Sequence, residues 1–217
     1  MRNLIAVLTL LALARFTTCG LSAAEENAHT KSAPVNLSVG AAAPIFNSID
    51  DRGKPWASGD HVGKQYMVIY FYPADFTTGC TKQAATFRDT MNLLADQDVS
   101  VIGVSGDSVL NHRLFKKAWK LNFTLLADEA GEIAAKFGVP IQPGGKVVPR
   151  GPDRKILTDE NGKQVRLERK TTFARWTFII GKDGKILYKN TKVQPVNDSQ
   201  QVLGFIAKLK KESKSAL

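Results

Sequence analysis

The residues with the clearest chemical potential lie on one short stretch of the chain. Pro73 is followed by Thr77 four residues on, and by Cys80 three residues further. A cysteine thiolate is a nucleophile, and a nearby threonine hydroxyl can orient a small substrate beside it. A lone cysteine can instead be a small apolar core residue. The order of residues around Cys80 favours the first interpretation and predicts thiol chemistry.

Two patterned segments position this cysteine. Residues Tyr66 to Tyr72 form an apolar run of β-branched and aromatic side chains, which predicts one buried strand. Pro73 ends the strand because proline has no N–H to donate. A helical period follows from Gly79, and its apolar face carries Ala84, Phe87, Met91 and Leu94. Cys80 is therefore expected in the first turn of a helix, where partial positive charge and free N–H groups favour a thiolate.

The segment Pro73-Ala-Asp-Phe-Thr77-Thr-Gly-Cys80 matches the active-site pattern of the peroxiredoxins. The surrounding FYPADFTTGCTKQA resembles their Q-type branch, also called bacterioferritin comigratory proteins, and the likeness runs from about Val39 to Lys210. The resemblance implies an α/β, thioredoxin-like fold, in which a central mixed β-sheet is flanked by helices and an N-terminal hairpin is added. It also implies an antioxidant, thiol-dependent peroxidase that reduces hydrogen peroxide and organic hydroperoxides without a cofactor.

The resemblance implies a role for each matching residue. Cys80 would be the peroxidatic thiolate, which attacks a peroxide oxygen and becomes a sulfenic acid. Thr77 would orient the peroxide, and backbone N–H groups around Gly79 and Cys80 would hold its oxygens. Pro73 would form the loop wall that keeps water away. Arg175 stands immediately before an expected strand, as the matching family arginine does, and would stabilise both thiolate and peroxide.

Two departures from the family pattern concern the chemistry. Many Q-type relatives carry a resolving cysteine five residues after the first, where this chain has Ala85. No other cysteine exists outside the first 24 residues, so we predict a one-cysteine mechanism. An external thioredoxin-like or low-molecular-weight thiol would reduce the sulfenic acid through a mixed disulfide, or two chains would join through Cys80. Thr78 and Gln83 replace residues that are often Pro and Glu, and like Asp75 they receive no role.

Other redox and metal functions lack their residues. A thiol–disulfide oxidoreductase needs a CxxC pair, and a copper-delivering relative needs two cysteines and a histidine. His29, His61 and His112 show no ligand spacing relative to Cys80, so we predict no metal site and interpret them as surface residues. Two alternatives stay open: a non-catalytic peroxide sensor, and an exported binding protein that uses a basic insertion.

Residues 1–24 have the pattern of a secretory signal peptide. Arg2 precedes an apolar stretch, Leu4 to Ala14, that is too short to span a bilayer, and Ser22-Ala23-Ala24 offers a cleavage site. The pattern predicts an exported protein, periplasmic or secreted, with no membrane attachment after cleavage. Cys19 leaves a lipoprotein open, and a retained anchor is a further alternative. Residues 25–38 are polar and predict a flexible tether.

Residues 39–217 are expected to form one peroxiredoxin domain, in which strands alternate with helices and a hairpin follows. Helix Val109–Lys120 is expected to place Leu110, Leu114 and Trp119 on its apolar side. The other expected elements are strands Val99–Ser105, Phe123–Leu126, Trp176–Ile180 and Ile186–Tyr188, and helices Glu129–Phe137 and Asn197 or Asp198 to Leu209.

The formal net charge of +10 and the insertion at residues 141–174 raise the question of partners. A solvated basic surface is the interpretation we favour, and no nucleic-acid-binding motif is present. Within the insertion, apolar triplets flank Asp159-Glu160-Asn161-Gly162-Lys163 and predict a protruding hairpin. The insertion is either a lid or docking arm, or a surface decoration. The expected partners are a hydroperoxide and a thiol reductant, and the resemblance implies a monomer or weak dimer.

Overall fold

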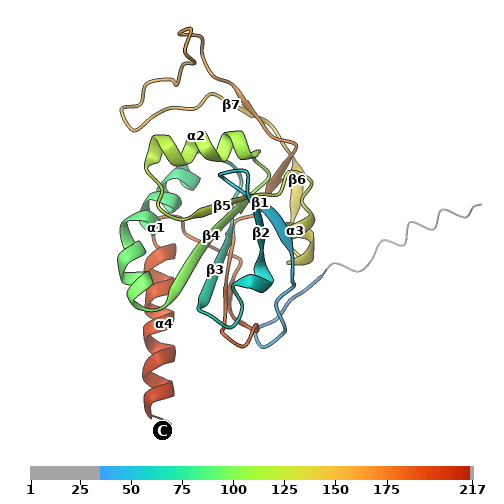
Figure 1. Ribbon diagram of the computed structural model, residues 1–217, viewed down its shortest axis with the longest axis vertical. Coiled ribbons are helices and arrows are strands. Elements are labelled where there is room, and N and C mark those ends of the chain that lie inside the picture. Colours follow the sequence, from blue (N-terminus) through green and yellow to red (C-terminus); the bar gives the residue numbers. More distant parts are fainter. Residues whose placement is uncertain (1–34, 216–217) are drawn as a thin grey trace, which may run out of the picture. The chain divides into compact units, whose positions relative to one another are not determined.

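The computed structural model describes residues 35–215 (Figure 1). The predicted signal peptide, Cys19, His29 and most of the predicted tether lie outside this range. Across residues 35–215, none of the helices has the length and apolar character needed to cross a bilayer.

A seven-stranded mixed sheet forms the centre of the fold, as the resemblance implied. The central strand β3 is parallel to β4, and β4 is parallel to β5, while the outer strands are antiparallel. The order across the sheet is β11 (Ile186–Asn190), β10 (Trp176–Ile180), β3 (Tyr66–Phe71), β4 (Val99–Ser105), β5 (Thr124–Ala127), β1 (Asn47–Asp50) and β2 (Pro55–Ala57). The pair β1 and β2 is the expected N-terminal hairpin.

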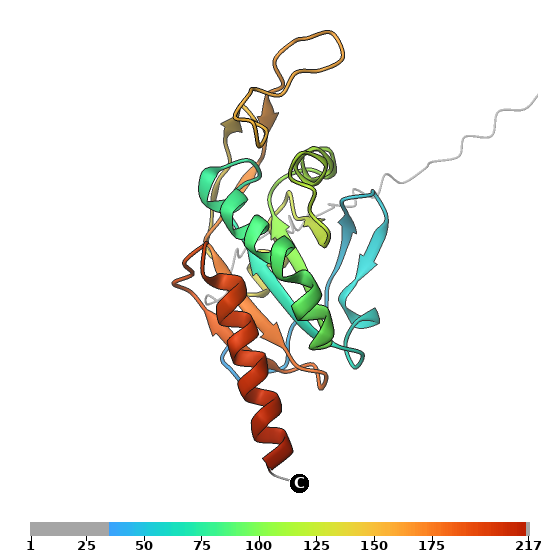
Figure 2. The same ribbon diagram turned by 90° about the vertical axis from the view of Figure 1, so that its left-hand side faces the viewer.

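Helices cover both faces of this sheet, which explains the continuous apolar run of β3. Alternate side chains of the segment point to opposite faces: Tyr70 packs with α1, α2 and α4, whereas Phe71 packs with α3. Figure 2 shows α1 and α4 side by side over one face. The helices are α1 (Thr78–Asp96), α2 (Val109–Trp119), α3 (Glu132–Lys136) and α4 (Asp198–Ser215), with a 3-10 turn at Ser58–Asp60.

Two helices differ in length from the prediction. Helix α3 begins at Glu132 rather than Glu129, because the Asp128 carboxylate accepts hydrogen bonds from the backbone N–H groups of Ile133 and Ala134 and so caps the first turn there. Helix α4 continues to Ser215 instead of ending near Leu209.

Residues 141–174, called the arm below, form a long hairpin that extends past α2 (Figure 1). At its base β6 (Ile141–Pro143) pairs with β9 (Thr171–Phe173), and further out β7 (Lys146–Val147) pairs with β8 (Leu167–Glu168). An isolated bridge between Thr158 and Gln164 encloses the Asp159–Lys163 turn, as the sequence predicted.

The buried side of α2 was predicted correctly for Trp119, which packs against the core, and wrongly for Leu110. Leu110 is 60% exposed, and the side chains that face the core are Asn111, His112 and Phe115. The prediction of His112 as a surface residue is therefore wrong as well. The apolar pattern misled because two of the three buried side chains are polar and find partners on other elements.

Candidate active site

Cys80 lies in the first turn of α1 on the face that packs against β3. Its side chain is 1% exposed and belongs to the same core cluster as Tyr70. The preceding Thr77 is the N-cap residue in extended conformation, with φ −78° and ψ 148°. Among residues 35–215, Cys80 is the only cysteine, and it is free.

Arg175 reaches this sulfur from the start of β10. Its Nη2 donates a hydrogen bond to Cys80 Sγ at 3.2 Å, and its Nη1 donates to Gln83 Oε1. The planar guanidinium thus bridges two side chains that lie three residues apart on one face of α1. This geometry stabilises negative charge on the sulfur, because a charge-assisted hydrogen bond is stronger than one between neutral groups.

A second layer of contacts holds Gln83, the partner of Arg175 Nη1, in place. Gln83 Nε2 donates to Asp198 Oδ2 at 2.6 Å, and Thr177 Oγ1 donates to the same oxygen at 2.8 Å. An ionised carboxylate only accepts hydrogen bonds, so Gln83 must present its NH₂ to Asp198 and its carbonyl to Arg175. Burial raises the pKa of Asp198, whereas the hydrogen bonds from Thr177 and Gln83 and the charge of Arg175 oppose this shift.

Sequence reasoning missed this second layer. Gln83 received no role, and Asp198 was considered only as a helix cap. The i, i+3 spacing of Cys80 and Gln83 was a usable signal, because it places both side chains on one face of α1. Nothing local marked Asp198, which is 115 positions away from Gln83.

Exchanging the amide of Gln83 with the carboxylate of Asp198 tests this arrangement. Gln83→Glu alone places two carboxylates in contact in a buried site, where both cannot ionise together without cost. Asp198→Asn alone removes the charge that orients Gln83. We expect each single variant to lower the rate constant for peroxide consumption about 10-fold, and the double variant to recover most of it, a coupling of about 2 to 3 kcal/mol.

The control for the exchange is Gln200→Glu, at an exposed position of α4. It should consume peroxide at the wild-type rate. Stopped-flow measurements of the wild type, the two single variants, the double variant and the control provide the rate constants, and purely additive losses would contradict the coupling.

Thr77, Gly79 and Pro73 surround the same helix terminus. Thr77 Oγ1 donates to the carbonyl oxygen of Ala74 at 3.0 Å, which leaves the lone pairs of the hydroxyl oxygen available to a substrate. A Cβ at Gly79 would lie 3.3 Å from Arg175 Nη2, so glycine lets the guanidinium approach the backbone. Pro73 is half-buried and directly follows Tyr72, whose N–H makes the last hydrogen bond to β4.

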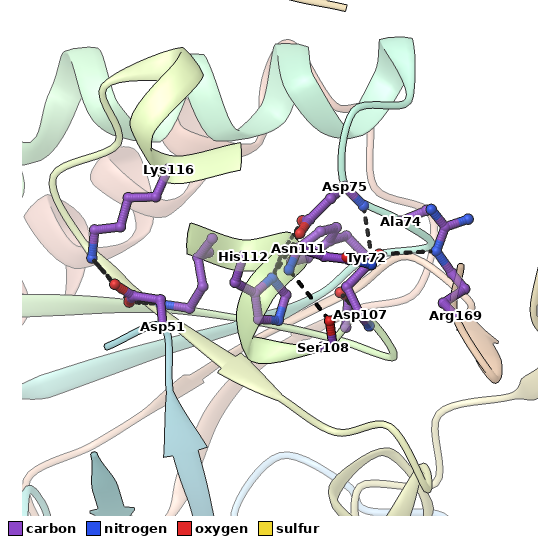
Figure 3. A network of polar contacts seen from close by, with 12 residues as sticks. Asp51, Tyr72, Ala74, Asp75, Asp107, Ser108, Asn111, His112, Lys116 and Arg169 are labelled. Carbon is purple, nitrogen blue, oxygen red and sulfur yellow. Dashed lines mark hydrogen bonds and ion pairs between the residues drawn. The ribbon is translucent and has the colours of Figure 1, made fainter. Parts of the chain in front are cut away.

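A buried polar network around Asp75 fixes the loop between β3 and α1 (Figure 3). The carboxylate of Asp75, which is fully buried, accepts a hydrogen bond from Tyr72 OH at 2.8 Å and contacts His112 Nδ1 at 2.8 Å. The backbone N–H of Asp75 donates to Asp107 Oδ2 at 2.9 Å. Asp107 Oδ1 in turn accepts from Arg169 Nε at 3.1 Å. The loop is thereby connected to both α2 and the arm.

The contacts of His112 fit a positively charged ring. Its Nδ1 faces the Asp75 carboxylate and its Nε2 lies 3.1 Å from the carbonyl oxygen of Leu126, so a ring that is protonated at both nitrogens donates to two acceptors. Burial lowers the pKa of His112, but the charge and hydrogen bond of Asp75 and the charge of Asp107 outweigh burial, and the net shift is upward.

The raised pKa of His112 predicts a pH dependence of stability. The native state binds this proton more tightly than the unfolded state, so the stabilisation is complete below the ordinary value of about 6.5 and is lost as pH rises toward the folded pKa. We expect the free energy of unfolding to fall as the pH rises above about 6.5, by at most about 1.4 kcal/mol per pH unit.

Urea titrations at several pH values measure this slope, and His112→Gln should reduce it. His61→Gln is the matched control, because His61 is half-buried and stacks on Trp56 outside the network. Equal slopes in the wild type and the His112 variant would contradict a charged His112.

Comparisons with known proteins agree with this geometry. The chain matches the AhpC/TSA family over residues 39–189. It is 41% identical over 126 residues to a chloroplastic peroxiredoxin Q of Oryza sativa subsp. japonica, an alignment that covers 58% of this chain and 56% of the relative. It is 38% identical over 172 residues to the bcp peroxiredoxin of Coxiella burnetii, covering 78% and 99%. The chain thus spans little more than half the length of the rice relative.

A solved structure supports the same assignment. Peroxidoxin BcpB from Mycobacterium tuberculosis shares the fold with a TM-score of 0.63 and 26% identity, covering 79% of this chain and 97% of that one. The resemblance inferred from the segment around Cys80 is therefore confirmed: this chain belongs to the AhpC/TSA family and, within it, to the peroxiredoxins of the Q or bacterioferritin comigratory type.

Proposed function

We propose that this protein is a thiol-dependent peroxidase that reduces hydrogen peroxide and organic hydroperoxides through Cys80. The observation that carries the proposal is the hydrogen bond from Arg175 Nη2 to Cys80 Sγ, at 3.2 Å, beneath a helix N-terminus. This pairing supplies a permanent cation next to the sulfur and next to the O–O bond that must break.

The first step transfers one oxygen atom to sulfur. The Cys80 thiolate attacks one peroxide oxygen, an S–O bond forms, and the O–O bond breaks. The leaving hydroxide or alkoxide takes up a proton and departs as water or an alcohol, while Cys80 becomes a sulfenic acid. Arg175 stabilises the charge that moves from the sulfur to the leaving oxygen, so its effect is larger in the transition state than before reaction.

The residues of the loop position the peroxide for this step. Thr77 accepts a hydrogen bond from the peroxide through the oxygen whose proton is directed to Ala74. The backbone N–H groups of Gly79 and Cys80, at the unpaired start of α1, hold the oxygens. Pro73 closes the loop wall and limits the access of water.

Reduction of the sulfenic acid requires an external thiol, because Cys80 has no cysteine partner within residues 35–215. A thioredoxin-like protein or a low-molecular-weight thiol attacks the oxidised sulfur, and a mixed disulfide forms. We also propose export to a periplasmic or extracellular space, which the signal-peptide pattern of residues 1–24 supports.

The test uses residues 25–217, which retain the whole compact unit Pro34–Leu217. The reduced protein is mixed with one equivalent of hydrogen peroxide, and peroxide loss is followed by stopped flow. Mass spectrometry should find one added oxygen on Cys80. A rate no greater than that of a free thiol at the same pH would overturn the proposal.

A further inference from the structure

A pocket separates the outer side of α1 from the arm. Its volume is about 400 Å³, within the range of roughly 300 to 1,000 Å³ typical of small-molecule sites. The pocket is lined by the loop before α1, the first two turns of α1, the end of α2 and one side of the arm. The apolar part consists of Phe76, Ala85, Trp119, Val148 and Pro152.

The charged side chains of this pocket all have the same sign. Lys82, Arg150 and Arg154 line it, and no carboxylate does. Other cations of the arm are neutralised, as in the pairs Lys146–Glu168 and Lys155–Asp153, but within residues 35–215 no acidic side chain forms an ion pair with the three lining cations. The pocket therefore favours an anionic molecule that also has an apolar or polarizable body.

The pocket and Cys80 occupy opposite sides of the same two helical turns. Thr78, Thr81 and Lys82 point to the pocket at i, i+3 and i+4, whereas Cys80 points to the core. The side chain of Cys80 is 1% exposed, so there is no room for a molecule bonded to its Sγ while the sulfur stays in this position. The first turn must then carry the sulfur outward, and the pocket is the recess on the outer side of that turn.

We propose that this pocket binds the reducing substrate, a small thiol of peptide size that carries one or more carboxylates. This inference rests on the proposed peroxidase function and specifies its second half. Arg150, Arg154 and Lys82 bind the carboxylates, and the apolar wall around Trp119 receives the rest of the molecule. The arm thus supplies a binding site next to the one cysteine of the described chain.

The redox steps balance with two molecules of this thiol. The first thiolate attacks the sulfenic sulfur of Cys80, an S–S bond forms, the S–O bond breaks, and the hydroxide leaves as water with the proton of the thiol. The second thiolate attacks the first thiol's sulfur in the mixed disulfide and releases the Cys80 thiolate. Two thiols supply two electrons, and these are the electrons that the peroxide received.

Glutathione and its diethyl ester provide a matched pair of probes, because they share the thiol and the peptide body and differ in the two carboxylate charges. Cys80 is first oxidised with one equivalent of peroxide, and the sulfenic acid is verified by mass spectrometry before any thiol is added. The rate of reduction by each probe is then measured. We expect the wild type to prefer glutathione over the ester at least 10-fold.

The double variant Arg150→Gln, Arg154→Gln should reduce this preference to about 2-fold or less. Its control, Lys163→Gln with Arg166→Gln, removes two exposed cations of the arm outside the pocket and should retain the wild-type preference. In the unmutated protein, S-methylglutathione should compete with glutathione, whereas its diethyl ester should not.

The outcomes separate the two proposals. If no sulfenic acid forms, the peroxidase function itself is wrong. If it forms but the wild type reduces equally fast with both probes, or if both double variants lose the preference alike, the pocket does not bind an anionic thiol. Absence of competition by S-methylglutathione would overturn the inference without any substitution.

Discussion

Replacement of Cys80 by serine should abolish peroxide consumption, with a loss of at least about 10⁴-fold in the rate constant. A serine hydroxyl beside Arg175 is not ionised at neutral pH and cannot store the oxygen atom as a sulfenic acid does. No other thiol is present in the described chain to replace it. The measurement is stopped-flow peroxide loss, together with a mass spectrum that should show no added oxygen.

The buried position of Cys80 makes a folding control necessary. Serine places a hydroxyl in an apolar cluster, whereas Cys80→Ala keeps the site apolar and leaves only a small gap. Both variants should retain the circular dichroism spectrum and unfold cooperatively. Substantial peroxide consumption by a folded alanine variant would show that another group performs the chemistry.

Strands with a continuous apolar run could be predicted from the sequence almost residue by residue. The predicted strands Val99–Ser105 and Trp176–Ile180 coincide with β4 and β10, and the first predicted strand exceeds β3 by only Tyr72. Burial on both faces leaves a pattern that does not depend on distant residues. Local sequence was therefore sufficient for these three strands, β3, β4 and β10.

The polar interior could not be predicted in the same way. His112 and Asn111 are buried because distant groups, the Asp75 carboxylate and the carbonyl oxygen of Glu168, supply their hydrogen-bond partners. A local pattern assigns such side chains to the surface, since an unpaired polar group in the core is costly. Leu110 was misplaced for the same reason, because these polar residues occupy the core side of α2 in its stead.

The candidate site likewise contains residues that local sequence indicates and residues that only the fold brings together. Thr77, Gly79 and Cys80 are consecutive or nearly so, and one motif was enough to indicate them. The second layer of contacts depends on the hydrogen bond between Gln83 of α1 and Asp198 of α4, and no local spacing reveals that contact. The pocket between α1 and the arm depends in addition on how the arm folds back, which periodicity alone does not define.

Removal of the guanidinium at Arg175 should be the second most damaging change. Arg175→Ala removes the hydrogen bond to Cys80 Sγ and the cation that stabilises the leaving oxygen, so we expect a loss of about 10² to 10³-fold in the rate constant for peroxide consumption. Arg175→Lys retains the charge but cannot contact Cys80 and Gln83 together through a planar fork, so we expect an intermediate loss of roughly 10-fold or more.

The ordering of these variants distinguishes charge from geometry. If charge alone mattered, lysine would restore nearly full activity; if only the bridge to Gln83 mattered, lysine would be as poor as alanine. Arg166→Ala removes an exposed arginine of the arm and serves as the control for net charge, with an expected rate equal to the wild type. A rate for Arg175→Ala within about threefold of the wild type would mean that the contact with Cys80 has no catalytic effect, and the transition-state argument built on it would fail.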